Sequence, residues 1–270
     1  MRKGHSRHRS MPSFARKVPQ NAKDLSRTAD TVIVLETEML RPMDNPEQAL
    51  SACKEAMTHT SDWEKLYHCV ENIRRIAVHS PSSLLSDVRK IMSFLQLQAK
   101  GLRSAAVKNA LFALREVISA HGRRAIAFDC RTLMRSLIVL ATCDKGFIKK
   151  AAMGALDSIS GSASCEHALI HVLSCVVKPN AKMVSCGALY ARKIATSMSA
   201  KELKSMRKMT TIFEHLLRIK GNARLADARK HTDATIAIIA GAHGTQAFGA
   251  FVKKNFFGRH ALTLLQCANR

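Results

Sequence analysis

The hydrophobic residues of this chain recur at helical spacing over most of its length. In the stretch that begins at Ser61, Leu66, Val70 and Ile73 lie on one face of a helix. Residues 102–121 continue the same spacing with a longer apolar face. No segment alternates apolar and polar residues for long enough to compete as a strand. The pattern therefore predicts helix after helix from residue 45 onward.

Candidate caps support the predicted boundaries. Asn45 stands before Pro46, the usual order of an N-cap and a proline in the first turn. Ser61 and Glu64 have the spacing of a capping box, which makes Ser61 the predicted N-cap of the second helix. Trp63 then falls in the first turn of that helix, at the edge of a loop. Twelve helices are predicted in all, over residues 45–58, 61–79, 80–99, 102–121, 125–142, 146–160, 164–177, 180–198, 200–219, 222–241, 244–254 and 257–268.

The breaks between these helices repeat along the chain. The loops inside successive helix pairs fall near residues 60, 101, 144, 179 and 222. Their spacing of roughly 35–43 residues is close to the period of HEAT-type repeats. We therefore predict an all-α fold, an α-solenoid of about six HEAT-like antiparallel helix pairs over residues 45–270. A globular helical bundle is the alternative, but it gives no reason for the period.

The first 44 residues lack this periodicity. Residues 1–30 carry eight Lys and Arg against two Asp, with few apolar residues, and we predict a disordered basic arm. A mitochondrial presequence is the rival interpretation, which the shortage of apolar residues for an amphipathic helix disfavours. Residues 31–44 are predicted to form an extended lead-in that packs on the first repeat.

The amino-acid composition and net charge indicate which kinds of partner this protein could bind. The net charge is +23, with 47% hydrophobic and only 5% aromatic residues. Such an excess of cations favours an acidic partner, which is a nucleic acid, an anionic membrane or an acidic protein surface. No apolar run approaches the ~20 residues that span a bilayer, so no membrane partner is expected. The eight cysteines form no CxxC pair and are predicted to be free thiols in a reducing compartment.

Charge is distributed unevenly between the two long edges of the predicted solenoid. In such a stack the loops within pairs share one edge, and the loops between pairs share the other. Between pairs, only Arg123 and Arg124 make a basic cluster. A single charged loop is most simply a solvated surface, but several basic loops in register predict a binding ridge. On the within-pair edge the predicted binding residues are Lys65, Lys100, Arg103, Lys145, Lys149, Lys182, Lys220 and Arg224.

Trp63, the only tryptophan, lies at the amino-terminal end of this basic edge. Its simplest interpretation is a lid folded over the first repeat. An aromatic side chain beside basic residues is also the usual composition of a protein-interface anchor. Its place at the end of a row of basic loops favours the anchor over the lid.

Catalytic motifs are missing from the sequence. It contains no GxxxxGK[ST] loop, GxSxG elbow or HExxH motif, so we expect no enzyme and predict no cofactor. His167 and His171 are four residues apart, with Cys165 and Cys175 beside them, a spacing compatible with a zinc site. Ordinary packing within an apolar helix is the favoured interpretation of these four residues.

Several segments resemble a TOG domain of the CLASP type. They are SDWEKLYHCVENIRRI and, farther along, KGLRSAAVKNALFALREVISAHGRRA. NPEQALSACKEAMTHTSDWEKL is similar to the first helix and tryptophan-bearing turn of that family, and NARLADARK to its fifth-repeat loop and helix. The TOG proteins of axonemal microtubules share the pattern equally well. The match extends over residues 45–268.

This resemblance implies a six-repeat HEAT domain that binds the αβ-tubulin dimer through the loops within its pairs. By position, Trp63 would pack against β-tubulin, and Arg224 would lie nearer α-tubulin. The basic arm would contact the acidic tubulin tails. The implied function is that of a microtubule-associated protein of the cytoplasm and cytoskeleton, which regulates microtubule dynamics. A nucleic-acid-binding repeat and a generic HEAT adaptor for another acidic partner are the alternatives that the charge leaves open.

Overall fold

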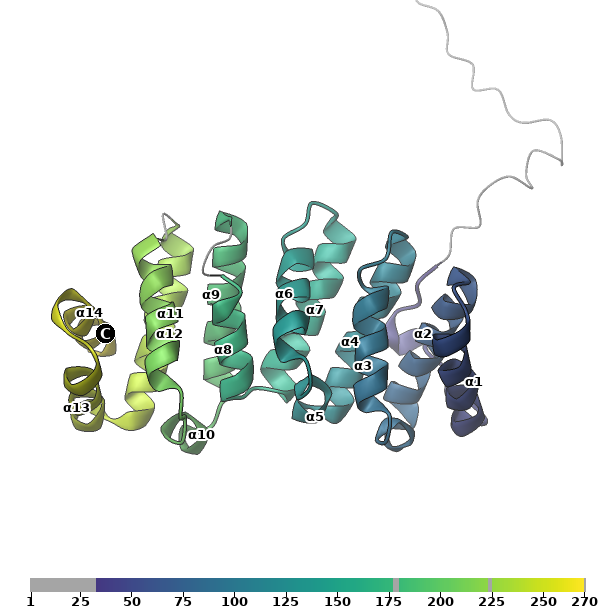
Figure 1. The fold of residues 1–270 in the computed structure, drawn as a ribbon, viewed down its shortest axis with the longest axis horizontal. Helices are drawn as coiled ribbons and strands as arrows, with labels where there is room; N and C mark the ends of the chain where they lie inside the picture. The colour runs from purple at the N-terminus through teal and green to yellow at the C-terminus, as the bar shows by residue number, and fades with distance from the viewer. Residues whose placement is uncertain (1–32, 177–179, 223–224, 270) are drawn as a thin grey trace, which may run out of the picture. The chain divides into compact units, whose positions relative to one another are not determined.

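The fold is a stack of six antiparallel helix pairs. The computed structural model describes residues 33–176, 180–222 and 225–269, and over these ranges it contains helices and no strand. Asn45 caps the first helix as predicted, since its side chain accepts the backbone N–H of Gln48 at 3.0 Å. Figure 1 shows the pairs following one another in chain order, which confirms the predicted α-solenoid. The pairs are α1 (Pro46–His59) with α2 (Trp63–His79), α3 (Val88–Gln98) with α4 (Ser104–His121), α6 (Cys130–Ala141) with α7 (Gly146–Ser162), α8 (Glu166–Ser174) with α9 (Ala181–Ser197), α11 (Met209–Asn222) with α12 (Ala226–His243), and α13 (Thr245–Asn255) with α14 (Gly258–Ala268).

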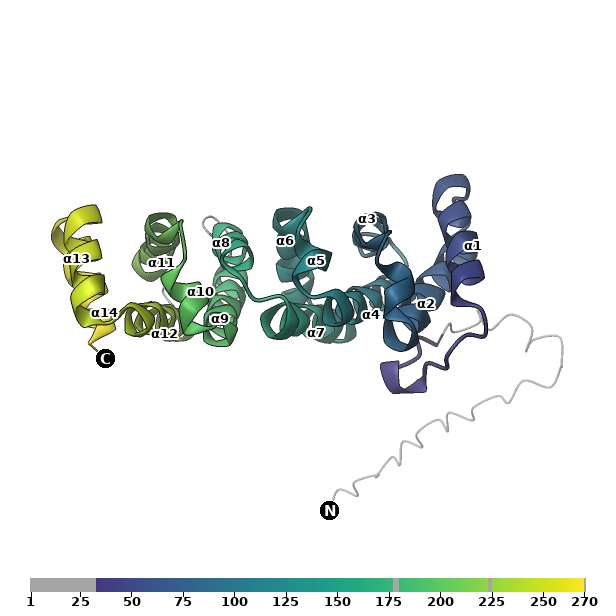
Figure 2. The same cartoon turned by 90° about the horizontal axis from the view of Figure 1, so that it is seen from below.

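The helices form two layers with the hydrophobic core between them (Figure 2). The second helices of the pairs, α2, α4, α7, α9, α12 and α14, each pack on the next in one layer. In the other layer α6, α8 and α11 follow one another. Ile73, Leu111, Leu137 and Leu169 belong to the core and are at most 1% exposed. Burial of such side chains is worth about 1.5–3 kcal/mol each.

Short helical segments fill three connections between pairs. The predicted helices 80–99, 125–142 and 200–219 are therefore wrong at their amino-terminal ends, because each is divided in two. A helix that crosses from one layer to the other has to break, since an unbroken helix curves only gently. The extra segments are the 3-10 helix η3 (Pro81–Leu84), α5 (Arg123–Ile126) and α10 (Ala200–Lys204).

The start of α2 differs from the prediction by one residue. Asp62 is the N-cap, and its carboxylate accepts the backbone N–H of Glu64 at 3.0 Å. The capping box predicted at Ser61 is therefore wrong: aspartate is as good a cap as serine, and it stands one position nearer the helix. As a result α2 begins at Trp63.

The lead-in contacts the first and second helix pairs. The Leu40 side chain is buried, and its carbonyl oxygen lies 2.8 Å from His79 Nε2 at the end of α2. Glu36 forms an ion pair with Lys108 of α4 at 3.2 Å. The segment also includes a single turn of 3-10 helix, η2 (Thr37–Met39). The lead-in thus packs on the first pair, as predicted, and also contacts the second.

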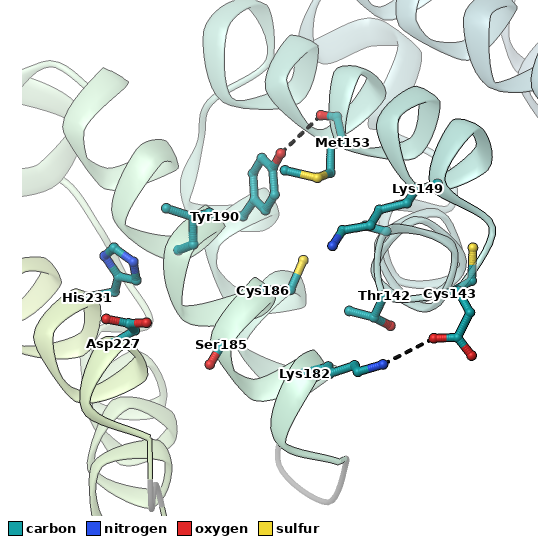
Figure 3. Close-up of a pocket in the computed structure, with 14 residues that line it drawn as sticks. Thr142, Cys143, Lys149, Met153, Lys182, Ser185, Cys186, Tyr190, Asp227 and His231 are labelled. Carbon is teal, nitrogen blue, oxygen red and sulfur yellow. Dashed lines mark hydrogen bonds and ion pairs between the residues drawn. The ribbon is translucent and has the colours of Figure 1, made fainter.

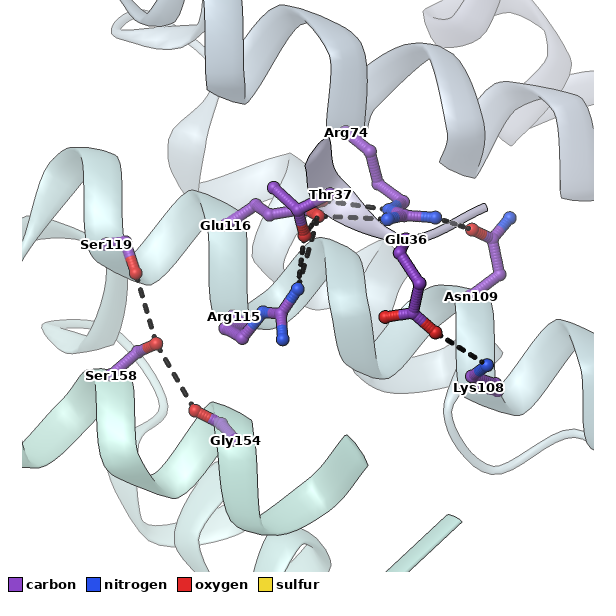
Figure 4. Close-up of polar contacts among 10 residues, drawn as sticks. All are labelled: Glu36, Thr37, Arg74, Lys108, Asn109, Arg115, Glu116, Ser119, Gly154 and Ser158. Atoms are coloured by element: carbon purple, nitrogen blue, oxygen red, sulfur yellow. Dashed lines mark hydrogen bonds and ion pairs between the residues drawn. The ribbon is translucent and has the colours of Figure 1, made fainter. Parts of the chain in front are cut away.

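A buried ion pair joins the first two helix pairs (Figure 4). Arg74 of α2 is fully buried and donates from Nε and Nη2 to Glu116 of α4, at 2.9 and 3.0 Å. Its Nη1 donates to Asn109 Oδ1 at 3.0 Å, and Asn109 Nδ2 donates to the Tyr67 carbonyl at 3.1 Å. The Thr37 hydroxyl of the lead-in donates to Glu116 Oε1 at 2.6 Å. These hydrogen bonds offset the cost of burying both charges.

The compact helical unit begins at Val34. The predicted basic arm, residues 1–30, lies outside the described residues. No single helix of the described part is long and apolar enough to cross a membrane. The pair α12 and α13 meets that length and composition only when taken together, and it is bent by 114°.

Candidate functional site

The predicted anchor Trp63 is the first residue of α2 and is half-buried. Arg103, in the next within-pair loop, covers its ring: the guanidinium carbon lies 4.1 Å from the ring centroid. A cation placed over an indole in this way is worth about 0.5–2 kcal/mol. Leu102 beside it is 99% exposed. The predicted helix 102–121 included this residue, but α4 begins only at Ser104, so Leu102 belongs to the loop. The first and second within-pair loops therefore come together in a surface patch that combines apolar side chains, Trp63 and Leu102, with the basic Arg103.

Two further polar contacts connect the within-pair loops of the second, third and fourth pairs. Lys145, which precedes α7, donates from Nζ to Ser104 Oγ at 3.0 Å. Lys182 in the first turn of α9 forms an ion pair with Asp144 at 3.1 Å. Both contacts are exposed and therefore weak, but they bring successive within-pair loops side by side. We refer to the set that follows as the loop ridge: Trp63, Arg103, Lys145, Lys149 and Lys182.

A cavity of about 600 Å³ opens at the carboxyl-terminal part of the loop ridge (Figure 3). Lys149 and Lys182 line it together with Asp227 and His231 of α12. The Lys149 side chain extends toward Cys186 of α9 (Figure 3). The cavity connects the third, fourth and fifth pairs, so the ridge continues toward α12 beyond the last direct contact.

Burial shifts the pKa values of two side chains that line this cavity, Cys186 and His231. Burial raises the pKa of the Cys186 thiol to about 11, although Lys149 and Lys193 oppose the shift. Burial also lowers the pKa of His231 below its usual value, with Arg192 adding to the effect. The thiol is thus protonated and the imidazole neutral at pH 7. The two lysines of the lining, Lys149 and Lys182, are matched by the carboxylates of Asp144 and Asp227, and neither Cys186 nor His231 is activated as a nucleophile.

Other predicted binding residues are not joined to the loop ridge by the contacts described above. Lys65 is exposed in the first turn of α2. Lys100 is exposed at the end of α3 and lines a different groove, between α3 and α6. Arg224 lies outside the described residues. Of the eight predicted residues that the structure describes, five belong to the loop ridge.

Lys220 has an internal role. Its ammonium group forms an ion pair with Asp233 of α12 and lies 3.1 Å from the Cys267 sulfur of α14. Burial opposes the charge, but the hydrogen bonds to Asp233 and Cys267 outweigh it and raise the pKa of Lys220 above its usual value. A lysine that is held in this way links the fifth and sixth pairs and has less freedom to contact a partner.

The between-pair edge carries an arrangement that resembles the Trp63 site. Arg89 of α3 lies over Phe128, which precedes α6, at 4.6 Å from the ring centroid, and Phe128 is 58% exposed. Arg123 on the same edge donates from Nε to the Ser164 carbonyl at 2.8 Å and also pairs with Glu202. An exposed cation–π pair is thus present on both edges, and Phe128 offers a matched control for Trp63.

The histidine and cysteine residues of α8 do not assemble a metal site in the described part of the chain, where no group of three metal-ligating side chains comes together. The rings of His167 and His171 pack edge to face at 4.4 Å. The Cys165 sulfur accepts the backbone N–H of Ala168 at 3.5 Å as the N-cap of α8. Packing and capping account for these residues.

Comparison with known proteins identifies the fold. No protein-family model matches the sequence, and no curated protein matches it either. Among solved structures, a TOG domain of Zyg9 from C. elegans aligns with a TM-score of 0.56 over 88% of this chain and 91% of that domain, at 14% identity. Two designed armadillo repeat proteins, one in complex with the peptide (KR)4, align with TM-scores of 0.43 and 0.41 at 15% and 14% identity, over 72% and 83% of this chain and 82% and 98% of their own.

The chain has a TOG-like fold. At 14% identity the Zyg9 alignment shows the fold alone. The resemblance to the CLASP type, which rests on the segments around Trp63 and on residues 100–125, stays a prediction.

Replacing Arg103 by glutamine is expected to expose the Trp63 ring. Because Trp63 is the only tryptophan, the fluorescence of the chain reports this site alone. The emission maximum should move to longer wavelength, and acrylamide should quench it more strongly, since the guanidinium no longer covers one ring face. Lys65→Gln, an exposed cation of the same turn, should leave both unchanged. Identical emission from wild type and Arg103→Gln would contradict the stacked arrangement.

Proposed function

We propose that this chain binds αβ-tubulin through the loop ridge and thereby regulates microtubule dynamics, as a TOG domain of the CLASP type. The observation that carries the proposal is the contact between successive within-pair loops, with Trp63 under Arg103 at one end and Lys182 near the other. The TOG-like fold and the net charge of +23 support it. The protein acts in the cytoplasm, on the cytoskeleton, as a binding protein and not as an enzyme.

The apolar and the basic side chains of the loop ridge contribute differently to the proposed interface. Trp63 and the exposed Leu102 supply the apolar area that anchors an interface, with Trp63 against β-tubulin. Arg103, Lys145 and Lys149 steer the acidic partner and pair with its carboxylates at the rim, so they act mainly on the association rate. Lys182 adds charge at the carboxyl-terminal end of the ridge, and Lys65 and Lys100 add charge outside it. Lys220, which is held by Asp233, contributes only to the overall positive charge. The proposal also includes Arg224 and, toward the acidic tubulin tails, the basic arm.

Trp63→Ala is expected to weaken binding to unpolymerised tubulin by about 2 kcal/mol, roughly a thirtyfold rise in Kd. The side chain is half-buried at a helix start, so the fold survives its removal. Sedimentation velocity of the full chain with soluble tubulin at two salt concentrations measures the effect.

Phe128→Ala is the matched control for this experiment. It removes an exposed aromatic ring that is also covered by an arginine, but on the between-pair edge. We expect tubulin binding to be unchanged in Phe128→Ala. Equal losses in both variants, or no loss in Trp63→Ala, would remove the loop ridge from the interface.

A nucleic-acid partner is the second candidate, favoured only by the net charge of +23. Such a partner gives an affinity that falls steeply with salt, by a slope set by the number of phosphates neutralised. The loop ridge carries one aromatic side chain, Trp63, and so lacks a row of stacking platforms for single-stranded bases. Tight binding of RNA or DNA that competes with tubulin and survives Trp63→Ala would favour this candidate.

A further inference from the structure

A second basic site, which shares no residue with the loop ridge, lies in the layer of first helices. A groove of about 630 Å³ lies between the end of α3 and α6. These two helices are neighbours in the amino-terminal half of the stack (Figure 2). Its lining combines cationic, hydroxyl and apolar side chains: Ala99, Lys100, Arg131, Thr132, Arg135, Ser136, Val139 and Leu140. The groove shares with the predicted binding edge only Lys100.

The charge in this groove is uncompensated. Lys100, Arg131 and Arg135 line it, no carboxylate does, and none of the three forms an ion pair with a described residue. Asp129, at the start of α6, is engaged as its N-cap and accepts the backbone N–H of Thr132 at 3.3 Å. Like charges that converge without a partner raise the local potential and favour an incoming anion.

The geometry of α6 defines what kind of anion fits. Arg131 and Arg135 are one helical turn apart, about 5–6 Å between their Cβ atoms. Alternate side chains of an extended peptide are separated by about 7 Å on the same face, so flexible arginines can meet two of its carboxylates. Thr132 and Ser136 each follow one of the two arginines in the sequence and line the same groove, where their hydroxyl groups are able to donate to the same oxygens.

The groove also has an apolar part. Val139 is 47% exposed, and Leu140 and Ala99 line the groove beside it. No aromatic side chain lines the groove among the described residues, which disfavours stacking of nucleic-acid bases. Cations next to exposed aliphatic surface match a peptide in which acidic and aliphatic residues are mixed.

We propose that the groove between α3 and α6 binds an acidic peptide segment of a partner protein, with carboxylates on Arg131 and Arg135 and an aliphatic side chain on Val139. The site would let the chain hold a second protein while the loop ridge is occupied. It does not depend on the tubulin proposal, because only Lys100 is common to both.

The test uses the full chain and a short fluorescein-labelled peptide that alternates glutamate and leucine. Fluorescence anisotropy should report binding, and the double variant Arg131→Gln/Arg135→Gln should weaken it at least about tenfold, since two charge-assisted hydrogen-bonding groups are lost. Both side chains are exposed, so the variant is expected to fold, which circular dichroism checks. The matched control is Lys201→Gln/Lys204→Gln, two exposed cations of α10 on the between-pair edge.

Each outcome decides the proposal. A loss in the arginine variant but not in the lysine variant supports the groove. Equal losses in both variants mean attraction by net charge alone and overturn the proposal, as does the absence of peptide binding. A single-stranded oligonucleotide that binds more tightly than the peptide, and is lost in the same variant, overturns it in favour of nucleic acid. Trp63→Ala should leave peptide binding intact, so a failure of tubulin binding is distinguishable from a failure here.

Discussion

Replacing Arg74 by alanine is expected to lower the free energy of unfolding by about 3–5 kcal/mol. Arg74 is fully buried between α2 and α4, and three of its nitrogens donate to Glu116 and Asn109 at 2.9–3.0 Å. Its removal leaves the Glu116 carboxylate buried and without its main partner. The penalty for this buried carboxylate exceeds the net contribution of the ion pair, since the hydroxyl of Thr37 and the more distant Arg115 replace only part of what Arg74 supplied.

Urea denaturation followed by circular dichroism measures this change. The informative control replaces both partners, in Arg74→Met/Glu116→Leu, because no charge is then left unpaired. We expect the double variant to recover most of the stability that Arg74→Ala loses. A double variant as unstable as the single one would mean that packing of Arg74, and not the buried charge, is the larger contribution.

The same network connects stability to the proposed interface. Tyr67, whose carbonyl accepts from Asn109, is one turn after Trp63 on α2. Asn109 lies on α4, whose first residue follows Arg103 directly. The network therefore fixes the offset between the two helices whose starts carry the cation–π pair. An altered Trp63 emission in Arg74→Ala, under conditions where the chain is still folded, would report that loss of register.

The period of the helix breaks was sufficient to predict the fold, because each pair buries its apolar face only against the next pair. The same periodicity explains why loops near residues 101 and 144 lie side by side, as the Ser104–Lys145 contact shows. The repeat period thus predicts on which edge of the solenoid a lysine lies. It does not predict which side chains that lysine contacts.

Lys220 and Arg74 illustrate that limit. In the sequence Lys220 is a lysine at a helix end, like Lys100, and its contact with Asp233 depends on how α11 packs on α12. In the sequence Arg74 is one of two adjacent arginines, and nothing there marks it as the buried one, yet α4 brings Glu116 and Asn109 to it from far along the chain. Hydrogen bonds and ion pairs between side chains of different repeats can be identified only from the three-dimensional structure. A one-residue error at Ser61 has a more local origin, since two adjacent residues compete to cap the same helix.

Phe213→Ala is expected to destabilise the carboxyl-terminal end of the stack by about 3–5 kcal/mol. The Phe213 ring of α11 is fully buried, and its centroid lies 5.4, 5.8 and 6.4 Å from those of Phe248, Phe251 and Phe256. These partners belong to α13 and to the turn that follows it, beyond the 114° bend after α12. Phe213 therefore ties the sixth pair to the fifth, and its loss leaves a cavity at that junction.

Because each pair contacts only its neighbours, the damage should stay local before it becomes global. Hydrogen exchange should rise first in α13 and α14, while α2 and α4 keep their protection and Trp63 emission is unchanged. Phe257→Ala provides the control: the ring is 80% exposed in the turn between α13 and α14, and a surface change of this kind is worth at most about 0.5 kcal/mol. Equal destabilisation by both variants would show that the aromatic cluster does not hold the sixth pair, and uniform exchange along the chain would show that the stack unfolds as one cooperative unit.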